Sequence, residues 1–280
     1  MPKEPTVFEE FELYKGKCKV KFYPNSHRYI VNGKPTGGSV TSIISIYDKS
    51  QALVTWATEL AREYLLEIGV GKITEENIYE SCELHAIKKK EAADVGTKIH
   101  DWCDKFIRNE NPPMPEEKEV QIGVNAFMEW IADNKVKFIS SERAVYSRKH
   151  DFVGKMDIEA KVNGKLCLID LKSSNGLYNT MYMQTAAYVK ADEEESGKKY
   201  QGRWLLRLAK ETEKEYNARM SKKNSIRERK GKDTIEFPPY QVFETKFLDN
   251  ETLDRDYNAF LACKKLKEYD GLTGFWANKK

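Results

Sequence analysis

Residues 141–188 read SERAVYSRKHDFVGKMDIEAKVNGKLCLIDLKSSNGLYNTMYMQTAAY, and the centre of this stretch decides the fold. Two runs of alternating, β-favouring residues, 152–162 and 165–172, flank the dipeptide Asn163-Gly164. This dipeptide is the strongest short-range signal for a two-residue type I′ turn. The stretch therefore predicts a β-hairpin.

The register of this hairpin brings two acidic residues together. Val162 pairs with Lys165 across the turn, and paired numbers keep a constant sum, so Asp157 falls directly opposite Asp170. Opposed side chains share a face, with Cβ atoms about 4.5–5.5 Å apart. Two unit charges ~4 Å apart repel by roughly 4 kcal/mol at an effective dielectric of ~20, against a domain stability of ~5–15 kcal/mol. We therefore expect a cation between them, with Lys172 on the same face.

The second strand of the hairpin is expected to be central in its sheet, because apolar residues line both of its faces. A hard divalent ion suits paired carboxylates: magnesium takes one or two of them plus substrate phosphate oxygens, and manganese tolerates the same ligands. The pair therefore predicts phosphodiester chemistry. In the alternative interpretation both aspartates are solvated and the lysine only neutralises them. Similar acid-x-lysine triplets begin at Glu116, Glu228 and Glu244.

Four motifs in a fixed order carry a family resemblance: Glu142, then Gly154-Lys155-Met156-Asp157, then Ile169-Asp170-Leu171-Lys172, then Gln184-Thr185-Ala186-Ala187-Tyr188. In this order they resemble the PD-(D/E)XK nucleases of the RecB-like, phage-type exonuclease branch, which includes lambda-type and mitochondrial genome maintenance exonucleases. The resemblance implies an α/β fold with a restriction-endonuclease-like core, in which helices flank a mixed central β-sheet and a helical cap precedes it.

The resemblance also assigns roles to residues of this chain. It implies that Asp157 and Asp170 bind one or two Mg²⁺ or Mn²⁺ ions, together with the backbone carbonyl of Leu171. Lys172 is then expected to assist the attacking water. Glu142 is expected to reach the metal directly or through water, and the alternative for it is a solvated strand glutamate.

A histidine in an earlier helical segment is a further candidate ligand. Gly96 and His100 are i, i+4 neighbours on one helix face, and the glycine permits close backbone approach. This spacing resembles the G-x-x-x-H element of the family. We expect His100 to bind metal through a neutral imidazole nitrogen; the alternative is a hydrogen-bonded structural histidine.

Two further pairs of residues are candidates for DNA binding. In the predicted helix 178–191, Gln184 and Tyr188 share a face, and by resemblance they hold a base or sugar-phosphate near the metal. Tyr188 as an ordinary packing aromatic is the alternative. Ser39 and Thr41 lie in a segment that resembles the N-terminal part of phage-type relatives, where they either touch a backbone phosphate or serve as loop and helix-capping residues.

The sequence as a whole is expected to form two domains. Residues 1–110 are expected to hold an N-terminal hairpin and a helical cap that contributes His100, and residues 116–280 the nuclease core. Residues 210–233 form a charged insertion with nine basic and five acidic residues, expected as a solvated loop or a flexible strand-guiding arm. The expected elements are a hairpin over 18–31, helices over 50–68, 74–108, 116–134 and 250–269, and strands over 137–147, 200–208 and 240–247.

Composition limits the class of protein. With 280 residues, 40% hydrophobic and 32% charged, the sequence is that of a soluble globular protein. A net charge of +3 is too mild to identify a polyanionic partner. Five cysteines without a C-x-x-C spacing suggest neither zinc nor disulfides. Some of the RecB-like relatives that this sequence resembles hold an iron–sulfur cluster with four cysteines, three of them near the C-terminus; this sequence has only Cys263 there, so we expect no cluster. Since no apolar run reaches about 18 residues and no leader pattern is present, we expect a cytoplasmic protein of a bacterial or phage-infected cell, without membrane contact.

These observations predict a divalent-metal-dependent DNA exonuclease that acts on single strands or DNA ends in phage-type replication, recombination or repair. Its partner is DNA, with a recombination or replication protein as a possible second partner. Two alternatives stay open: a structure-specific endonuclease, and a catalytically inactive nucleic-acid-binding protein. The presence of every motif residue argues against the inactive protein.

Overall fold

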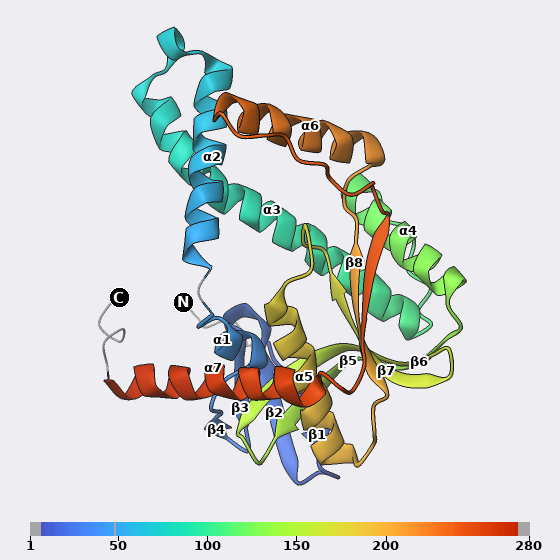
Figure 1. The fold of residues 1–280 in the computed structure, drawn as a ribbon. Coiled ribbons are helices and arrows are strands. Elements are labelled where there is room, and N and C mark those ends of the chain that lie inside the picture. Colours follow the sequence, from blue (N-terminus) through green and yellow to red (C-terminus); the bar gives the residue numbers. More distant parts are fainter. Residues whose placement is uncertain (1–6, 48, 274–280) are drawn as a thin grey trace.

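The computed structural model describes residues 7–47 and 49–273 (Figure 1). Most predicted helices and strands are present within two or three residues of their expected ends. Within the described ranges, no helix has the length and apolar character needed to span a membrane. The elements are β1 (Glu9–Leu13), β2 (Cys18–Tyr23), β3 (Arg28–Val31), β4 (Lys34–Pro35), α1 (Val40–Ile44), α2 (Ser50–Ile68), α3 (Glu75–Ile107), α4 (Lys118–Asp133), β5 (Val136–Ser147), β6 (Phe152–Val162), β7 (Lys165–Lys172), α5 (Asn179–Ser196), β8 (Gly202–Leu208), α6 (Glu213–Arg229), β9 (Phe243–Leu248) and α7 (Leu253–Thr273).

A five-stranded mixed sheet in the order β5-β6-β7-β8-β9 forms the centre of the molecule. Its neighbours are antiparallel except β7 and β8, which run parallel because α5 crosses between them. The predicted hairpin is confirmed: Val162 pairs with Lys165. Asn163 and Gly164 have φ angles of +51° and +86°, as a type I′ turn requires. The chain is therefore an α/β protein with helices on a mixed sheet.

Strand β7 is buried on both faces, which confirms the prediction that it is central. Leu168 packs in a core cluster with α1, α5 and α7, whereas Cys167, Ile169 and Leu171 pack with α3 and α4 on the opposite face. Asp170 therefore projects into the layer between the sheet and α5. A charged residue in that position lies in the protein interior.

The N-terminal segment forms a four-stranded antiparallel sheet in the order β1-β2-β3-β4, a larger unit than the predicted hairpin. The strands β1 and β4 were not expected, because β1 reads EEFEL and carries three acidic residues, and β4 has only two residues. Ser39 forms a parallel β-bridge with Val153 of β6, and α1 packs into the core that also holds α5 and α7. This sheet therefore lies against the core.

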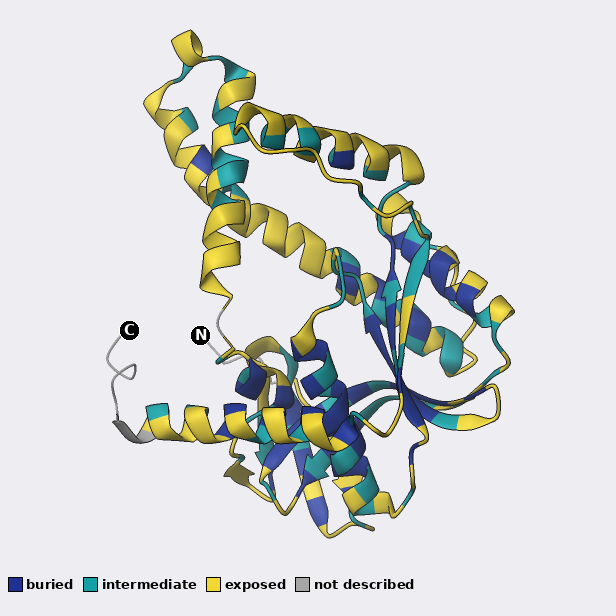
Figure 2. Cartoon of the chain, in the orientation of Figure 1, coloured by how far each residue is buried: buried dark blue, intermediate teal, exposed yellow. Residues whose placement is uncertain are grey.

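The helices α2 and α3 extend away from the sheet (Figure 1). Residues 50–56 at the start of α2 and most of residues 75–94 of α3 are exposed (Figure 2). Helix α2 has no buried residue, and its Trp56 is 39% exposed. On α7, Leu253 and Phe260 are buried, whereas Leu266 is exposed. Whether residues 1–110 form a separate domain stays a prediction.

The charged insertion is helical, which corrects the expectation of a solvated loop or a flexible arm. Residues Glu213–Arg229 form α6, and Thr212 caps this helix: its side chain accepts a hydrogen bond from the Glu215 backbone N–H while Glu215 bonds back to Thr212. The sequence signal was the capping box Thr212-x-x-Glu215, which precedes a run of good helix formers. The many charged residues of 210–233 favoured a loop prediction, so this capping signal was not used.

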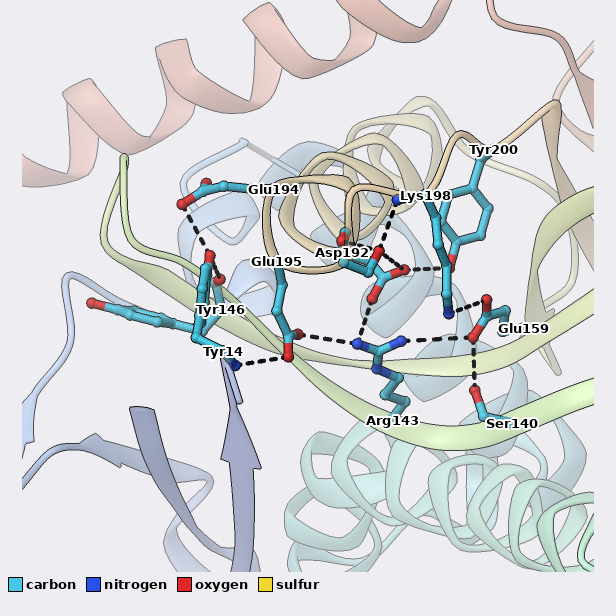
Figure 3. Close-up of polar contacts among 11 residues, drawn as sticks. Tyr14, Ser140, Arg143, Tyr146, Glu159, Asp192, Glu194, Glu195, Lys198 and Tyr200 are labelled. Carbon is cyan, nitrogen blue, oxygen red and sulfur yellow. Dashed lines mark hydrogen bonds and ion pairs between the residues drawn. The ribbon is translucent and has the colours of Figure 1, made fainter. Parts of the chain in front are cut away.

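A buried ion network fastens α5 to the sheet (Figure 3). The guanidinium of Arg143, on β5, lies 2.8 Å from Asp192 and 3.1 Å from Glu195 of α5, and 3.7 Å from Glu159 of β6. The hydroxyl of Tyr200 donates to Asp192 at 2.8 Å. Removing one member of a buried ion pair typically costs about 3–5 kcal/mol, so this network holds α5 firmly in position.

A close contact between β6 and α5 gives a test of the packing. A Cβ atom on Gly154 would lie 2.4 Å from Cε1 of the buried Tyr188 ring, and overpacking of a core typically costs about 1–3 kcal/mol. We expect Gly154→Ala to lower the urea midpoint accordingly. In the control Gly71→Ala, the new methyl group meets open space, so no loss is expected. Equal midpoints for the two variants would contradict this packing.

Candidate metal centre

Three side chains from distant parts of the sequence meet beside β7. They are His100 on α3, Glu142 on β5 and Asp157 on β6, and their ligand atoms all lie within 4.8 Å of one another. The Nδ1 atom of His100 lies 3.7 Å from an Asp157 carboxylate oxygen, and the two side chains are 27% and 15% exposed. One nitrogen ligand atom and several oxygen ligand atoms therefore lie close together at a half-buried site.

Glu142 has an unusual backbone conformation within β5. Its φ angle is +48°, in the left-handed region that non-glycine residues rarely adopt. The neighbours Ser141 and Arg143 pair with Ile158 and Met156 of β6, while Glu142 itself is skipped. Such a conformation costs about 1–3 kcal/mol, and strain of this kind is concentrated at functional sites. The sequence identifies Glu142 as an acidic candidate, but only the structure shows the strained backbone that positions it.

The hairpin ladder opens at the two aspartates. Regular pairing runs from Val162 and Lys165 to Ile158 and Ile169, and it ends one step before Asp157 and Asp170. In place of the next ladder bond, the Leu171 backbone N–H donates to the Asp157 carboxylate at 2.8 Å. The Asp157 side chain thus lies between the separating strands, close to the β7 residues that the sequence analysis placed in the site.

Asp170 is the most enclosed acidic group of the site. It is 0% exposed, and neither carboxylate oxygen has a hydrogen-bond partner among the described residues. Lys172 Nζ lies 2.5 Å from one of these oxygens and forms an ion pair with it. Burial raises the pKa of Asp170 to about 6; the Lys172 charge opposes this rise, and the Asp157 charge adds to it. Buried polar atoms nearly always have partners, so these oxygens are suited to a bound cation.

Neighbouring groups show the same crowding of negative charge. Burial raises the pKa of Asp157, against the effect of Lys172, and burial together with Asp157 raises the pKa of Glu142. Burial and the Lys172 charge lower the pKa of His100, which favours the neutral imidazole that binds metals. Although burial opposes it, the pKa of Lys172 is raised by Asp170 and Asp157, so the ammonium form is stabilised.

Sequence reasoning missed a role for Lys155. Its ammonium lies 3.1 Å from the Glu142 carboxylate and 3.1 Å from Glu9 on β1. It therefore connects the N-terminal sheet to the candidate metal centre. The available signal was its place two residues before Asp157, which puts both side chains on the same face of β6.

The expected close approach at Gly96 is confirmed. A Cβ atom there would lie 2.5 Å from the Ser173 hydroxyl, in the loop after β7. Only a glycine lets α3 come this near to the end of the strand. One helical turn later, His100 then reaches the carboxylates.

The candidate DNA-binding residues lie in two places. Gln184 donates to the Tyr188 hydroxyl at 3.1 Å, and Tyr188 is only 3% exposed because its ring packs against Gly154. Ser39 caps α1 by accepting from the Ser42 N–H at 3.2 Å, and its hydroxyl lies 3.3 Å from that of Thr41. Tyr188 is thus a packing aromatic and Ser39 a capping residue, and contact of these four residues with DNA stays a prediction.

No protein-family model matches this sequence. No curated protein matches it either. Among solved structures, an alkaline exonuclease from Laribacter hongkongensis is similar at 10% sequence identity, with a TM-score of 0.27 over 54% of this chain and 69% of that chain. A likeness this distant identifies neither family nor activity, and we therefore base the function on the site residues.

The raised pKa of Asp170 gives a test without activity. The folded protein keeps this proton to higher pH than the unfolded chain, so the carboxylate destabilises the metal-free fold increasingly as pH rises from about 4 to about 6. In chelator above pH 6, we expect Asp170→Asn to raise Tm by roughly 2–6 °C. The difference in Tm between variant and wild type should shrink as the pH falls toward 4.

A second buried aspartate provides the matched control. Asp192 is also 0% exposed, but it is ion-paired with Arg143 and accepts a hydrogen bond from Tyr200. Asp192→Asn should therefore lower Tm under the same conditions. A lower Tm for Asp170→Asn as well would show that Asp170 is a satisfied structural residue.

Proposed function

We propose that this protein is a divalent-metal-dependent deoxyribonuclease with a restriction-endonuclease-like core, of the RecB-like exonuclease branch, that hydrolyses phosphodiester bonds in replication, recombination or repair. One observation carries the proposal: His100, Glu142 and Asp157 converge beside the buried Asp170 carboxylate, which lacks hydrogen bonds, and Lys172 lies next to it. Negative charge concentrated in this way destabilises a fold, so its presence favours a metal-binding role.

The donor set fits Mg²⁺ or Mn²⁺. Carboxylate oxygens suit both ions, and the imidazole nitrogen suits the softer manganese. His100, Asp157 and Asp170 would hold the metal, with the Leu171 backbone carbonyl and with Glu142, either directly or through water. A bound ion of this kind would polarise the scissile phosphate and make a hydroxide nucleophile available near neutral pH.

Lys172 would position water and offset charge. Because Asp170 and Asp157 stabilise its ammonium form, it is a poor proton acceptor. It can instead donate hydrogen bonds to the attacking water and to the phosphate oxygens that gain charge as the bond breaks. Lys155 holds Glu142 at 3.1 Å and thereby fixes the direction of that carboxylate.

The contact between α2 and α6 favours an exonuclease. Two segments, the helical region before Pro112 and the insertion 210–233, are candidates for closing over a DNA strand. Helix α6 joins these segments: Lys222 pairs with Glu63 at 2.8 Å, and Lys230 pairs with Glu59 at 2.6 Å, both on α2. Figure 1 shows α6 crossing from the sheet to the distal part of the cap helices. A route closed on all sides would require a free strand end.

The chemistry is tested by single substitutions. Asp157→Asn, Asp170→Asn and Lys172→Ala should each lower cleavage of labelled DNA at least ~100-fold, because each removes a ligand or a charge at the reacting phosphate. Binding to the same DNA in chelator should persist. As a control, Lys161→Ala should cleave normally, because the Lys161 side chain is exposed near the turn end of β6. Wild-type rates in any one of the three site variants would overturn the assignment.

The requirement for an end is tested by DNA topology. With magnesium or manganese, we expect linear single-stranded DNA to be degraded from an end and a closed single-stranded circle of the same sequence to survive. Cleavage of the linear strand should fall as salt rises, because phosphate contacts release counterions. Rapid nicking of the circle at low enzyme concentration would favour the structure-specific endonuclease. Binding without any cleavage would favour the inactive nucleic-acid-binding protein.

A further inference from the structure

A cavity of about 330 Å³ lies beside the candidate metal centre. Its walls are the loop 173–175 after β7, residues 207–211 at the end of β8, Tyr216 and Arg219 of α6, and residues 238–241 before β9. A volume of this size is typical of a small-molecule site. The cavity therefore has room for one mononucleotide-sized group.

The cavity is adjacent to the proposed reactive lysine. Lys172 pairs with Arg207 in the parallel register of β7 and β8, so the two side chains share a face and their strands are ~4.8 Å apart. Arg207 in turn pairs with Glu244 of β9 and forms an ion pair with it at 2.8 Å. A row of charged side chains thus leads from the metal centre into the cavity.

The cavity has one positive charge in excess. Arg207 is paired with Glu244, and Arg219 is paired with Glu211. The half-buried Lys210 ammonium has no ion pair with any carboxylate in the part of the chain that the structure describes. Burial lowers the pKa of Lys210, against the effect of Glu211. A partly buried, unpaired ammonium is costly, and a phosphate would stabilise it.

Two tyrosine rings supply the apolar part of the cavity. The rings of Tyr216 and Tyr240 lie 5.7 Å apart at 58° to each other. Both hydroxyls are engaged: Tyr216 donates to the Pro238 carbonyl at 2.6 Å, and Tyr240 donates to the Glu211 carbonyl at 2.8 Å. The rings are therefore held in place, and an aromatic surface beside a cation suits a base and its phosphate.

We propose that this cavity binds one nucleotide of the DNA strand next to the cleaved phosphate, with the phosphate on Lys210 and the base against Tyr216 and Tyr240. The proposal rests on the proposed nuclease function and names a substrate contact for it. Stacking surfaces and a lysine read no base edge, so this nucleotide is bound with little sequence preference.

The experiment measures binding separately from cleavage. In chelator, the anisotropy of a fluorescein-labelled twelve-residue oligothymidylate reports the Kd of the 280-residue protein. We expect Lys210→Gln and Tyr240→Leu each to weaken binding about tenfold, the loss typical of one good contact. Lys214→Gln is the matched control, because Lys214 lies exposed on the first turn of α6 outside the cavity; its effect should stay below about twofold.

The outcomes separate this proposal from the function on which it rests. If the wild type binds and cuts DNA but Lys210→Gln and Tyr240→Leu bind as tightly as Lys214→Gln, the cavity proposal fails alone. If the wild type neither binds nor cuts, the nuclease proposal fails. Competition with unlabelled thymidine monophosphate then identifies the source of the bound nucleotide. If the monophosphate displaces the oligonucleotide from the wild type, the cavity binds a released product. If it does not, and the two variants bind the oligonucleotide more weakly, the cavity binds a nucleotide of the continuous strand.

Discussion

The burial of the Asp170 carboxylate determines how the rest of this structure is arranged. Strand β7 is buried on both faces, so an acidic residue inside it cannot reach bulk water, and neither oxygen finds a hydrogen bond. Lys172 supplies one positive charge, but Asp157 and Glu142 bring further negative charge to the same place. An uncompensated buried charge is among the most costly features a protein can contain, and this cost is the physical basis of the cation site that we propose here.

The contrast with the ion network at the C-terminal half of α5 shows that burial alone does not define the site. Asp192 is as buried as Asp170, yet Arg143 and Tyr200 both contact it. That network joins β5, β6 and α5 and serves to hold the layers together. Asp170, in contrast, has only the ion pair with Lys172 among the described residues, and this difference from Asp192 supports the metal-binding role that we propose for it.

Local signals made the centre of this fold predictable. The Asn163-Gly164 turn sets the register of β6 and β7, and the spacing of Gly96 and His100 identifies the helix that approaches the end of β7. The left-handed backbone at Glu142 and the link from Lys155 to β1 depend on which strands become neighbours. The contact between Lys155 and Glu9 joins residues 146 positions apart and has no counterpart in local sequence pattern. The left-handed backbone at Glu142 is a single irregular position inside β5 that no local pattern marks, so neither feature could be predicted.

Helix α6 differs from the core in how it is held, and this difference bears on function. The sheet is fixed by buried apolar side chains, whereas α6 contacts α2 through Lys222 and Lys230 paired with partly exposed glutamates. Exposed ion pairs contribute roughly 0–1 kcal/mol each and weaken with salt. Segments held by few buried contacts open locally at low free energy. The proposed metal ligands on β5, β6 and β7 thus lie in the densely packed sheet, and α6, which we propose closes over the strand, is held mainly by exposed ion pairs.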